Sequence, residues 1–120
     1  MSDKKVLVID DDESIRTLFE CVVEDLGFVC KVASSGEEGL KLIQSDEFAV
    51  IFLDIKMPKM NGIETLKEIK TINNNTVVTM MTGFSVDDLV EEALNLKAAD
   101  VLYKPFDVET LEEIVLKWLK

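Results

Sequence analysis

Short apolar runs alternate with helix-like patterns along the whole chain. Three of these runs are almost continuously apolar, as strands are when helices cover both faces of a parallel sheet. The expected strands are residues 5–9, 29–33, 49–53, 77–81 and 100–103. The sequence therefore predicts a central parallel sheet with helices on both sides.

The segments between these runs carry apolar residues three and four positions apart, which is the spacing of an amphipathic helix. The clearest stripe runs from Ile15 to Leu26, and Gly27 follows it as a stop signal. The other expected helix starts are Ser35 with Glu38 in capping-box spacing, Asn61-Gly62, Ser85 and Asp107. Five such strand–helix units predict an α/β sandwich with right-handed crossovers, two helices on one face and three on the other.

Length and composition restrict the class of protein. The 120 residues predict one domain over 1–120, and the longest apolar run, Phe48–Leu53, is far shorter than the ~20 residues of a membrane span. A net charge of −11 argues against direct binding to nucleic acid or an anionic membrane. Cys21 and Cys30 lack metal or redox spacing, and we expect both in the core of a cytoplasmic protein.

Polar residues follow four of the five expected strands. Asp10 and Asp11 come after the first, Asp54 after the third, Thr82 after the fourth and Lys104 after the fifth. The carboxyl ends of parallel strands meet at one edge of the sheet, where ligands bind in such folds. We therefore expect these five residues to lie together.

Each of these residues has a simpler structural interpretation when it is taken alone. Acids after the first strand can cap a helix and oppose its dipole, and we assign that role to Asp12 and Glu13. Asp54 by itself would be a turn residue, Thr82 a helix cap and Lys104 a surface charge. Their coincidence at four strand ends favours a chemical site.

Three aspartates at one place would raise one another's pKa unless a cation neutralises them. The chain has no histidine, and oxygen-only ligands favour Mg²⁺. Three carboxylates, one Mg²⁺ and Lys104 sum to zero charge. Such a site suits phosphoryl transfer to an aspartate, with the metal and Lys104 offsetting charge and Thr82 donating a hydrogen bond to a phosphoryl oxygen.

Four motifs carry these residues: the acid pair after VLVI, LDIKMPKMNG at 53–62, MTG at 81–83 and KPF at 104–106. With them the chain resembles the receiver domain of bacterial two-component response regulators. The resemblance spans essentially the whole chain. It implies a flavodoxin-like (βα)5 three-layer sandwich with a five-stranded parallel sheet in the order 2-1-3-4-5.

The resemblance also implies roles for individual residues. Asp54 would be the phospho-acceptor. Asp11 would bind Mg²⁺ directly and Asp10 largely through water, while Lys56 would lend its backbone carbonyl to the metal.

Thr82 and Lys104 would contact the phosphoryl group. We also expect the Lys104–Pro105 peptide bond to be cis, because the lysine must turn back towards the acids.

By the same resemblance, the phosphoryl donor is a sensor histidine kinase or a histidine phosphotransfer protein. The chain would be a signalling phosphoprotein that catalyses its own phosphorylation and dephosphorylation. A downstream protein would bind the surface of the fourth helix, fifth strand and fifth helix. No contact with nucleic acid or membrane is expected.

One position departs from the family pattern. Receivers usually carry Tyr or Phe three residues before the lysine–proline pair, where this chain has Val101, and Tyr103 lies two positions too late. Val101 is small and stiff. We therefore expect Thr82, Gly83 and Phe84 to carry the phosphorylation signal to the fourth helix.

Several alternatives remain open. The chain ends with the fifth helix, so it is either a stand-alone regulator or phosphorelay intermediate, or the excised N-terminal receiver of a longer regulator. A flavin-binding module needs a phosphate loop where this chain has four acids. A haloacid-dehalogenase-like phosphatase needs Asp-x-Asp where the chain has Asp54-Ile55-Lys56. A metal-free pseudo-receiver would not need the complete acid set.

Overall fold

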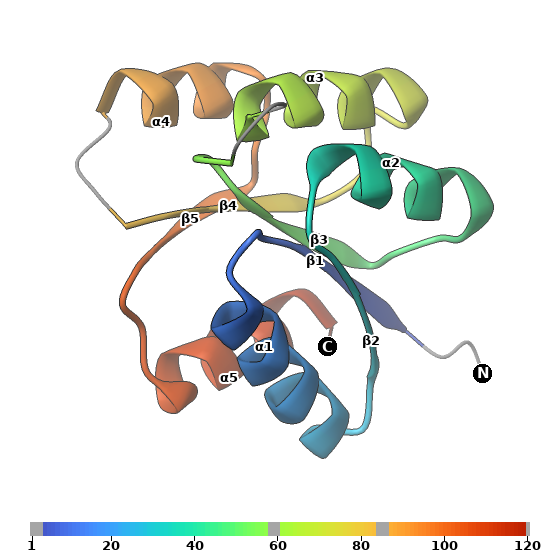
Figure 1. The fold of residues 1–120 in the computed structure, drawn as a ribbon, viewed down its shortest axis with the longest axis vertical. Coiled ribbons are helices and arrows are strands. Elements are labelled where there is room, and N and C mark those ends of the chain that lie inside the picture. The colour runs from blue at the N-terminus through green and yellow to red at the C-terminus, as the bar shows by residue number, and fades with distance from the viewer. Residues whose placement is uncertain (1–3, 58–60, 84–86, 120) are drawn as a thin grey trace.

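The computed structural model describes residues 4–57, 61–83 and 87–119. Strands and helices alternate along this part of the chain (Figure 1). The strands are β1 (Lys5–Ile9), β2 (Val29–Ala33), β3 (Val50–Asp54), β4 (Val78–Thr82) and β5 (Asp100–Tyr103). The helices are α1 (Glu13–Asp25), α2 (Gly36–Ser45), α3 (Gly62–Ile72), α4 (Asp87–Asn95) and α5 (Val108–Leu119).

All strand pairs are parallel, and the order across the sheet is β2-β1-β3-β4-β5. This confirms the predicted flavodoxin-like topology. β3 and β4 each begin and end one residue later than predicted. The hydrogen bonds between strands continue past the apolar runs, since Ile55 N–H donates to the Met81 carbonyl at 2.9 Å. Asp54 and Thr82 are therefore the last residues of their strands.

The helices form two layers, one on each face of the sheet. Figure 1 shows α1 and α5 on one face and α2, α3 and α4 on the other, as predicted. Side chains alternate between the faces along a strand, so Leu7 packs under α2–α4 while Val8 packs with α1 and α5. Phe19 of α1 lies 4.8 Å, centroid to centroid, from Phe52 of β3. This contact anchors α1 directly beneath the strand that ends in Asp54.

The helix ends agree with most of the sequence signals. Gly27 has φ +91°, the left-handed conformation expected of a glycine that ends a helix, and Phe28 N–H donates to Val23 O at 3.1 Å. Asp107 caps α5 by accepting a hydrogen bond from Thr110 N–H at 2.8 Å. The predicted cap at Ser85 and the expected role of Phe84 lie outside the described residues.

Ser35 and Asn61 cap α2 and α3 at the expected positions, but the capping box predicted for α2 is incomplete. Glu38 N–H donates to Ser35 Oγ at 3.1 Å, but the Glu38 carboxylate accepts from Ser34 N–H rather than from Ser35. The reciprocal capping box belongs to α3, where Asn61 and Glu64 exchange bonds of 3.0 and 3.2 Å. Asn61 thus fixes the start of the helix that follows Asp54.

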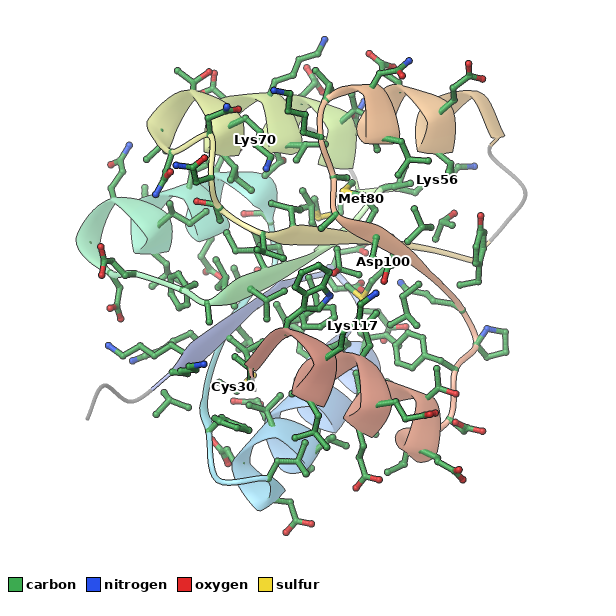
Figure 2. The ribbon with its side chains drawn as sticks, turned by 180° about the vertical axis from the view of Figure 1, so that it is seen from behind. Cys30, Lys56, Lys70, Met80, Asp100 and Lys117 are labelled. Atoms are coloured by element: carbon green, nitrogen blue, oxygen red, sulfur yellow. The ribbon has the colours of Figure 1, made fainter. Side chains whose placement is uncertain are left out.

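The prediction that both cysteines are buried is wrong for Cys21, which is exposed. It lies on the solvent side of α1, whose buried residues are Phe19, Val22 and Val23. Cys30 is buried on β2 and packs with the α1–α5 layer (Figure 2). Burial, together with the negative charges of nearby glutamates, raises the pKa of the Cys30 thiol to about 12.

We expect a thiol reagent at pH 8 to modify one cysteine of the native protein quickly, because only a thiolate reacts. Cys21→Ser should remove the fast phase, and Cys30 should react only after unfolding in denaturant. Mass spectrometry of the labelled protein measures both phases. Two equally fast thiols in the native parent would contradict the burial of Cys30.

Candidate functional site

The acids in the turn after β1 have two different roles, capping of α1 and formation of the site. Asp10 is fully buried, its N–H donates to the Ala33 carbonyl at 3.1 Å, and its Oδ1 accepts from Asp12 N–H at 2.9 Å. Asp12 is the N-cap of α1 and Glu13 is its first residue, as predicted. This leaves Asp10 and Asp11 to face the edge of the sheet.

Asp54 ends the neighbouring strand β3 and is only 5% exposed. One carboxylate oxygen from each of Asp10, Asp11 and Asp54 lies within 4.8 Å of the other two. Asp11 is exposed, so the cluster opens to solvent on that side. Three carboxylates without a thiolate or imidazole are the donor set of a hard divalent cation. The residues therefore fit a metal such as Mg²⁺, and the structure brings together the three aspartates predicted to bind it.

Lys104, from the turn after β5, reaches the same cluster. Its Nζ lies 2.8 Å from Asp10 Oδ2 and 3.6 Å from Asp54 Oδ1. Its backbone N–H donates to the Thr82 carbonyl at 2.7 Å, which ties the ends of β4 and β5 together. The Lys104–Pro105 bond is cis, as predicted. The ammonium group is thus bonded to Asp10 and stands beside Asp54.

The electrostatics of Asp54 follow from this arrangement. Burial, and next the charge of Asp10, raises the pKa of Asp54 from 3.8 to about 7, although Lys104 and the Lys56 N–H favour the ionised form. Crowding by other acids, the cause expected from the sequence, is thus second to burial. Burial also opposes the charge of Lys104, but its hydrogen bond to Asp10 and its proximity to Asp54 raise its pKa overall. Without a cation, the site therefore disfavours the ionised form of Asp54.

Thr82 and Lys56 complete the predicted set. Thr82 is 2% exposed at the end of β4, next to β3 in the sheet. Lys56 lies two residues beyond Asp54, and its N–H approaches Asp54 Oδ1 at 3.4 Å. The Lys56 side chain is exposed, and Figure 2 labels its position. All six predicted site residues therefore belong to the carboxyl edge of the sheet.

Two further residues at this edge were not predicted to belong to the site. Arg16 Nη1 donates to the backbone carbonyl of Asp10 at 2.8 Å. Gly62 N–H donates to Ile55 O at 2.8 Å, and a Cβ built on Gly62 would lie 2.6 Å from Ile55 Cα and closer still to the Asp54 carbonyl. The available signals were that Arg16 is the only arginine in the chain and that a glycine follows the cap residue Asn61.

A cavity of about 500 Å³ opens at the opposite end of the sheet. Its wall includes Lys5 at the start of β1, Phe48 before β3 and Ile72 at the end of α3. None of the three aspartates lines it. The residues of the candidate site therefore do not form part of this cavity.

Comparison with known proteins assigns the chain to a family. The model of the response regulator receiver domain matches residues 6–116, so the chain belongs to that family. Sporulation initiation phosphotransferase F of Bacillus subtilis is 34% identical over 119 residues, covering 99% of this chain and 96% of the relative. Among solved structures, chemotaxis protein CheY4 of Vibrio cholerae superposes with a TM-score of 0.92 at 32% identity, over 98% of this chain and all of that chain.

Other relatives are much longer than this chain. Transcriptional regulatory protein ZraR of Klebsiella oxytoca is 39% identical over 107 residues, which is 89% of this chain but 24% of the relative. The chain is thus a receiver domain homologous to response regulators of both short and long kinds. Within the described residues, no helix is long and apolar enough to cross a membrane.

Proposed function

We propose that the chain is a phosphorylation switch in which Asp54 accepts a phosphoryl group from a phosphohistidine, with Mg²⁺ bound at the adjacent acids. One observation carries this proposal: oxygens of Asp10, Asp11 and Asp54 lie within 4.8 Å of one another, and Lys104 Nζ stands beside them. A nucleophile, a metal-binding oxygen set and a fixed cation are the parts that phosphoryl transfer to a carboxylate needs.

In the proposed reaction an Asp54 carboxylate oxygen attacks phosphorus, the P–O bond forms and the P–N bond to the donor histidine breaks. The histidine nitrogen leaves with the electron pair and takes up a proton. The product is an acyl phosphate. Attack of water on its phosphorus later returns the carboxylate and inorganic phosphate. The chain would thereby promote its own phosphorylation and dephosphorylation, acting as a signalling protein rather than on a separate substrate.

The roles at the site follow from the contacts. Mg²⁺, when bound, would offset charge on the phosphoryl oxygens and keep Asp54 ionised. Asp11, being exposed, would ligate it directly, Asp10 would ligate it largely through water, and Lys56 would add its backbone carbonyl. Lys104, whose Nζ lies 3.6 Å from Asp54 Oδ1, would contact the new phosphoryl oxygens, and Thr82 would donate its hydroxyl to one of them.

The phosphoryl donor would be a sensor histidine kinase or a histidine phosphotransfer protein, and the output a protein rather than nucleic acid or membrane. The proposed partner surface is formed by α4, β5 and α5. It is supported by three large apolar side chains that are about half exposed, Leu94, Tyr103 and Val108. Thr82 would couple Asp54 to this surface because its carbonyl binds Lys104 at the end of β5.

The wider setting is also a proposal. We infer a cytoplasmic protein that works as a stand-alone regulator or phosphorelay intermediate. The match to nearly all of sporulation initiation phosphotransferase F supports this setting. The alternative, an N-terminal receiver of a longer regulator, has support from the quarter-length match to ZraR.

The test is incubation with acetyl phosphate followed by intact-mass measurement. We expect the parent to gain one phosphoryl group with Mg²⁺ present and none with EDTA. Asp11→Asn should slow the gain at least tenfold at limiting Mg²⁺, because a direct ligand is lost.

Asp12→Asn is the matched control for that experiment. It removes the same charge one residue away and keeps a good helix cap. It should label like the parent. An equal phosphoryl gain with and without EDTA, or an equal loss of labelling rate in both variants, would contradict a metal site that includes Asp11.

A further inference from the structure

The only arginine of the chain points at the turn that carries two of the three clustered aspartates. Arg16 lies on α1 and its side chain is half-buried. Helical side chains lean towards the N-terminus of their helix. The Arg16 guanidinium therefore reaches back over the first turn of α1, where Nη1 donates to the Asp10 carbonyl at 2.8 Å.

This position is unfavourable for a cation unless it has a specific partner. The N-terminal end of a helix carries partial positive charge, so arginine in the first turns is disfavoured by the dipole. The contact with Asp10 supplies such a partner. Arginine also suits a fixed contact better than lysine, because its planar group presents several donors in a rigid geometry.

Every polar group of Asp10 is then engaged. Its N–H donates to Ala33 O, its carbonyl accepts from Arg16, its Oδ1 accepts from Asp12 N–H and its Oδ2 accepts from Lys104. A residue bound on all sides cannot rotate without breaking several bonds. The direction in which the next residue, Asp11, leaves the turn is set by the same contacts.

We propose that Arg16 is a positioning residue for the metal site, which acts by holding the Asp10 carbonyl so that Asp11 faces Asp54. This inference rests on the proposed Mg²⁺-dependent function. Arg16 would act through the Asp10 backbone and would not itself ligate the metal. Residues that orient metal ligands in this way change metal affinity by about 10–100-fold when they are replaced.

The experiment is a Mg²⁺ titration of ¹⁵N,¹³C-labelled protein, followed by the amide shifts of the β1–α1 turn. Arg16→Gln keeps helix propensity but is too short to reach the carbonyl. We expect it to raise the Kd for Mg²⁺ about tenfold, and to shift the Asp10 carbonyl ¹³C signal before any metal is added. Arg16→Lys, which keeps the charge and one reaching donor, should recover part of the affinity.

Lys41→Gln is the control, because it removes one positive charge from an exposed position on α2. It should leave the Kd within twofold of the parent. A parent that fails to bind Mg²⁺ overturns the proposed function and this inference together. If the parent binds Mg²⁺ and Arg16→Gln binds it equally well, only the role of Arg16 is wrong, even if the variant is less stable to urea.

Discussion

Asp54→Asn is expected to abolish the phosphoryl gain and, at the same time, to make the metal-free protein more stable at pH 8. The first effect follows because an amide is not a competent acceptor. The second follows from the position of Asp54, which is 5% exposed and close to another buried carboxylate, so that its pKa is raised to about 7. At pH 8 the native protein must ionise a group in a place that disfavours the charge.

The direction of the pH dependence can be worked out from proton binding. Between pH 3.8 and about 7 the native state holds a proton on Asp54 that the unfolded chain has lost. The free energy of unfolding therefore falls as pH rises through this window. The full rise in pKa corresponds to about 4 kcal/mol, which screening by solvent at the open side reduces to roughly 1–3 kcal/mol. Asp54→Asn has no carboxyl group at this position, so its free energy of unfolding should not fall in this way as pH rises.

Urea titrations in EDTA at pH 4 and pH 8 measure the effect. The variant should match the parent near pH 4 and exceed it by roughly 1–3 kcal/mol at pH 8. Mg²⁺ should raise the stability of the parent at pH 8 and have a much smaller effect on the variant, because ligands that bind only the native state stabilise it.

Asp46→Asn is the control with the opposite sign. The hydrogen bond from Lys5 Nζ, at 2.8 Å, lowers the pKa of Asp46. Its contribution to stability is therefore present at neutral pH and is lost as pH falls. Asp46→Asn should not stabilise the protein at pH 8 and should label normally. If both variants gain the same stability at pH 8, general charge reduction explains the result and the burial of Asp54 does not.

The layers of the fold were predictable because the signals are local. Continuous apolar runs such as Val6–Ile9 indicate strands buried on both faces, and the stripe from Ile15 to Leu26 indicates a helix that packs on one side. Strand order depends on contacts between residues far apart in sequence, and it came from the family resemblance. The ends of β3 and β4 were placed one residue early because hydrogen bonding, not hydrophobicity, ends those strands.

The site was predictable to the level of which residues meet, because parallel strands bring their carboxyl ends to one edge. The partners within the site were not. Lys104 binds Asp10 at 2.8 Å rather than Asp54 at 3.6 Å, and this choice depends on side-chain placement across three strands. The contact of Arg16 was not predictable either. The spacing of Asp10 and Arg16 does not distinguish an arginine that binds the Asp10 carbonyl from an exposed helical residue.

Gly62→Ala is expected to destabilise the protein by about 2–4 kcal/mol, more than alanine at Gly39 or Gly83. The new Cβ would lie 2.6 Å from Ile55 Cα and closer still to the Asp54 carbonyl. Both neighbours are backbone atoms of the segment that leaves β3. Relief therefore requires α3 or the end of β3 to move. Urea titration at pH 7 with Mg²⁺ measures the loss.

Gly39 and Gly83 provide a graded series for that measurement. At Gly39 a Cβ would meet only side-chain atoms of Ile9, with Cγ1 at 2.7 Å and Cδ1 closer still, and no backbone atom, so the loss should be smaller than at Gly62. At Gly83 the nearest atom is Lys104 Cβ at 3.7 Å, an ordinary contact. The expected order of destabilisation is Gly62→Ala, then Gly39→Ala, then Gly83→Ala.

The steric clash in Gly62→Ala should also slow phosphorylation of Asp54. Gly62 N–H donates to Ile55 O, and Ile55 is the residue after Asp54. A shift of this segment moves the Asp54 carboxylate relative to Asp10 and Lys104, and phosphoryl transfer is sensitive to displacements of this size. We expect the initial rate of Mg²⁺-dependent labelling by acetyl phosphate to fall at least tenfold in folded Gly62→Ala, and to change little in Gly39→Ala, whose clash lies on the α2 side of β1. If the two variants lose rate equally at matched stability, the rate follows global stability, and the close approach of α3 to Asp54 has no special role in the reaction.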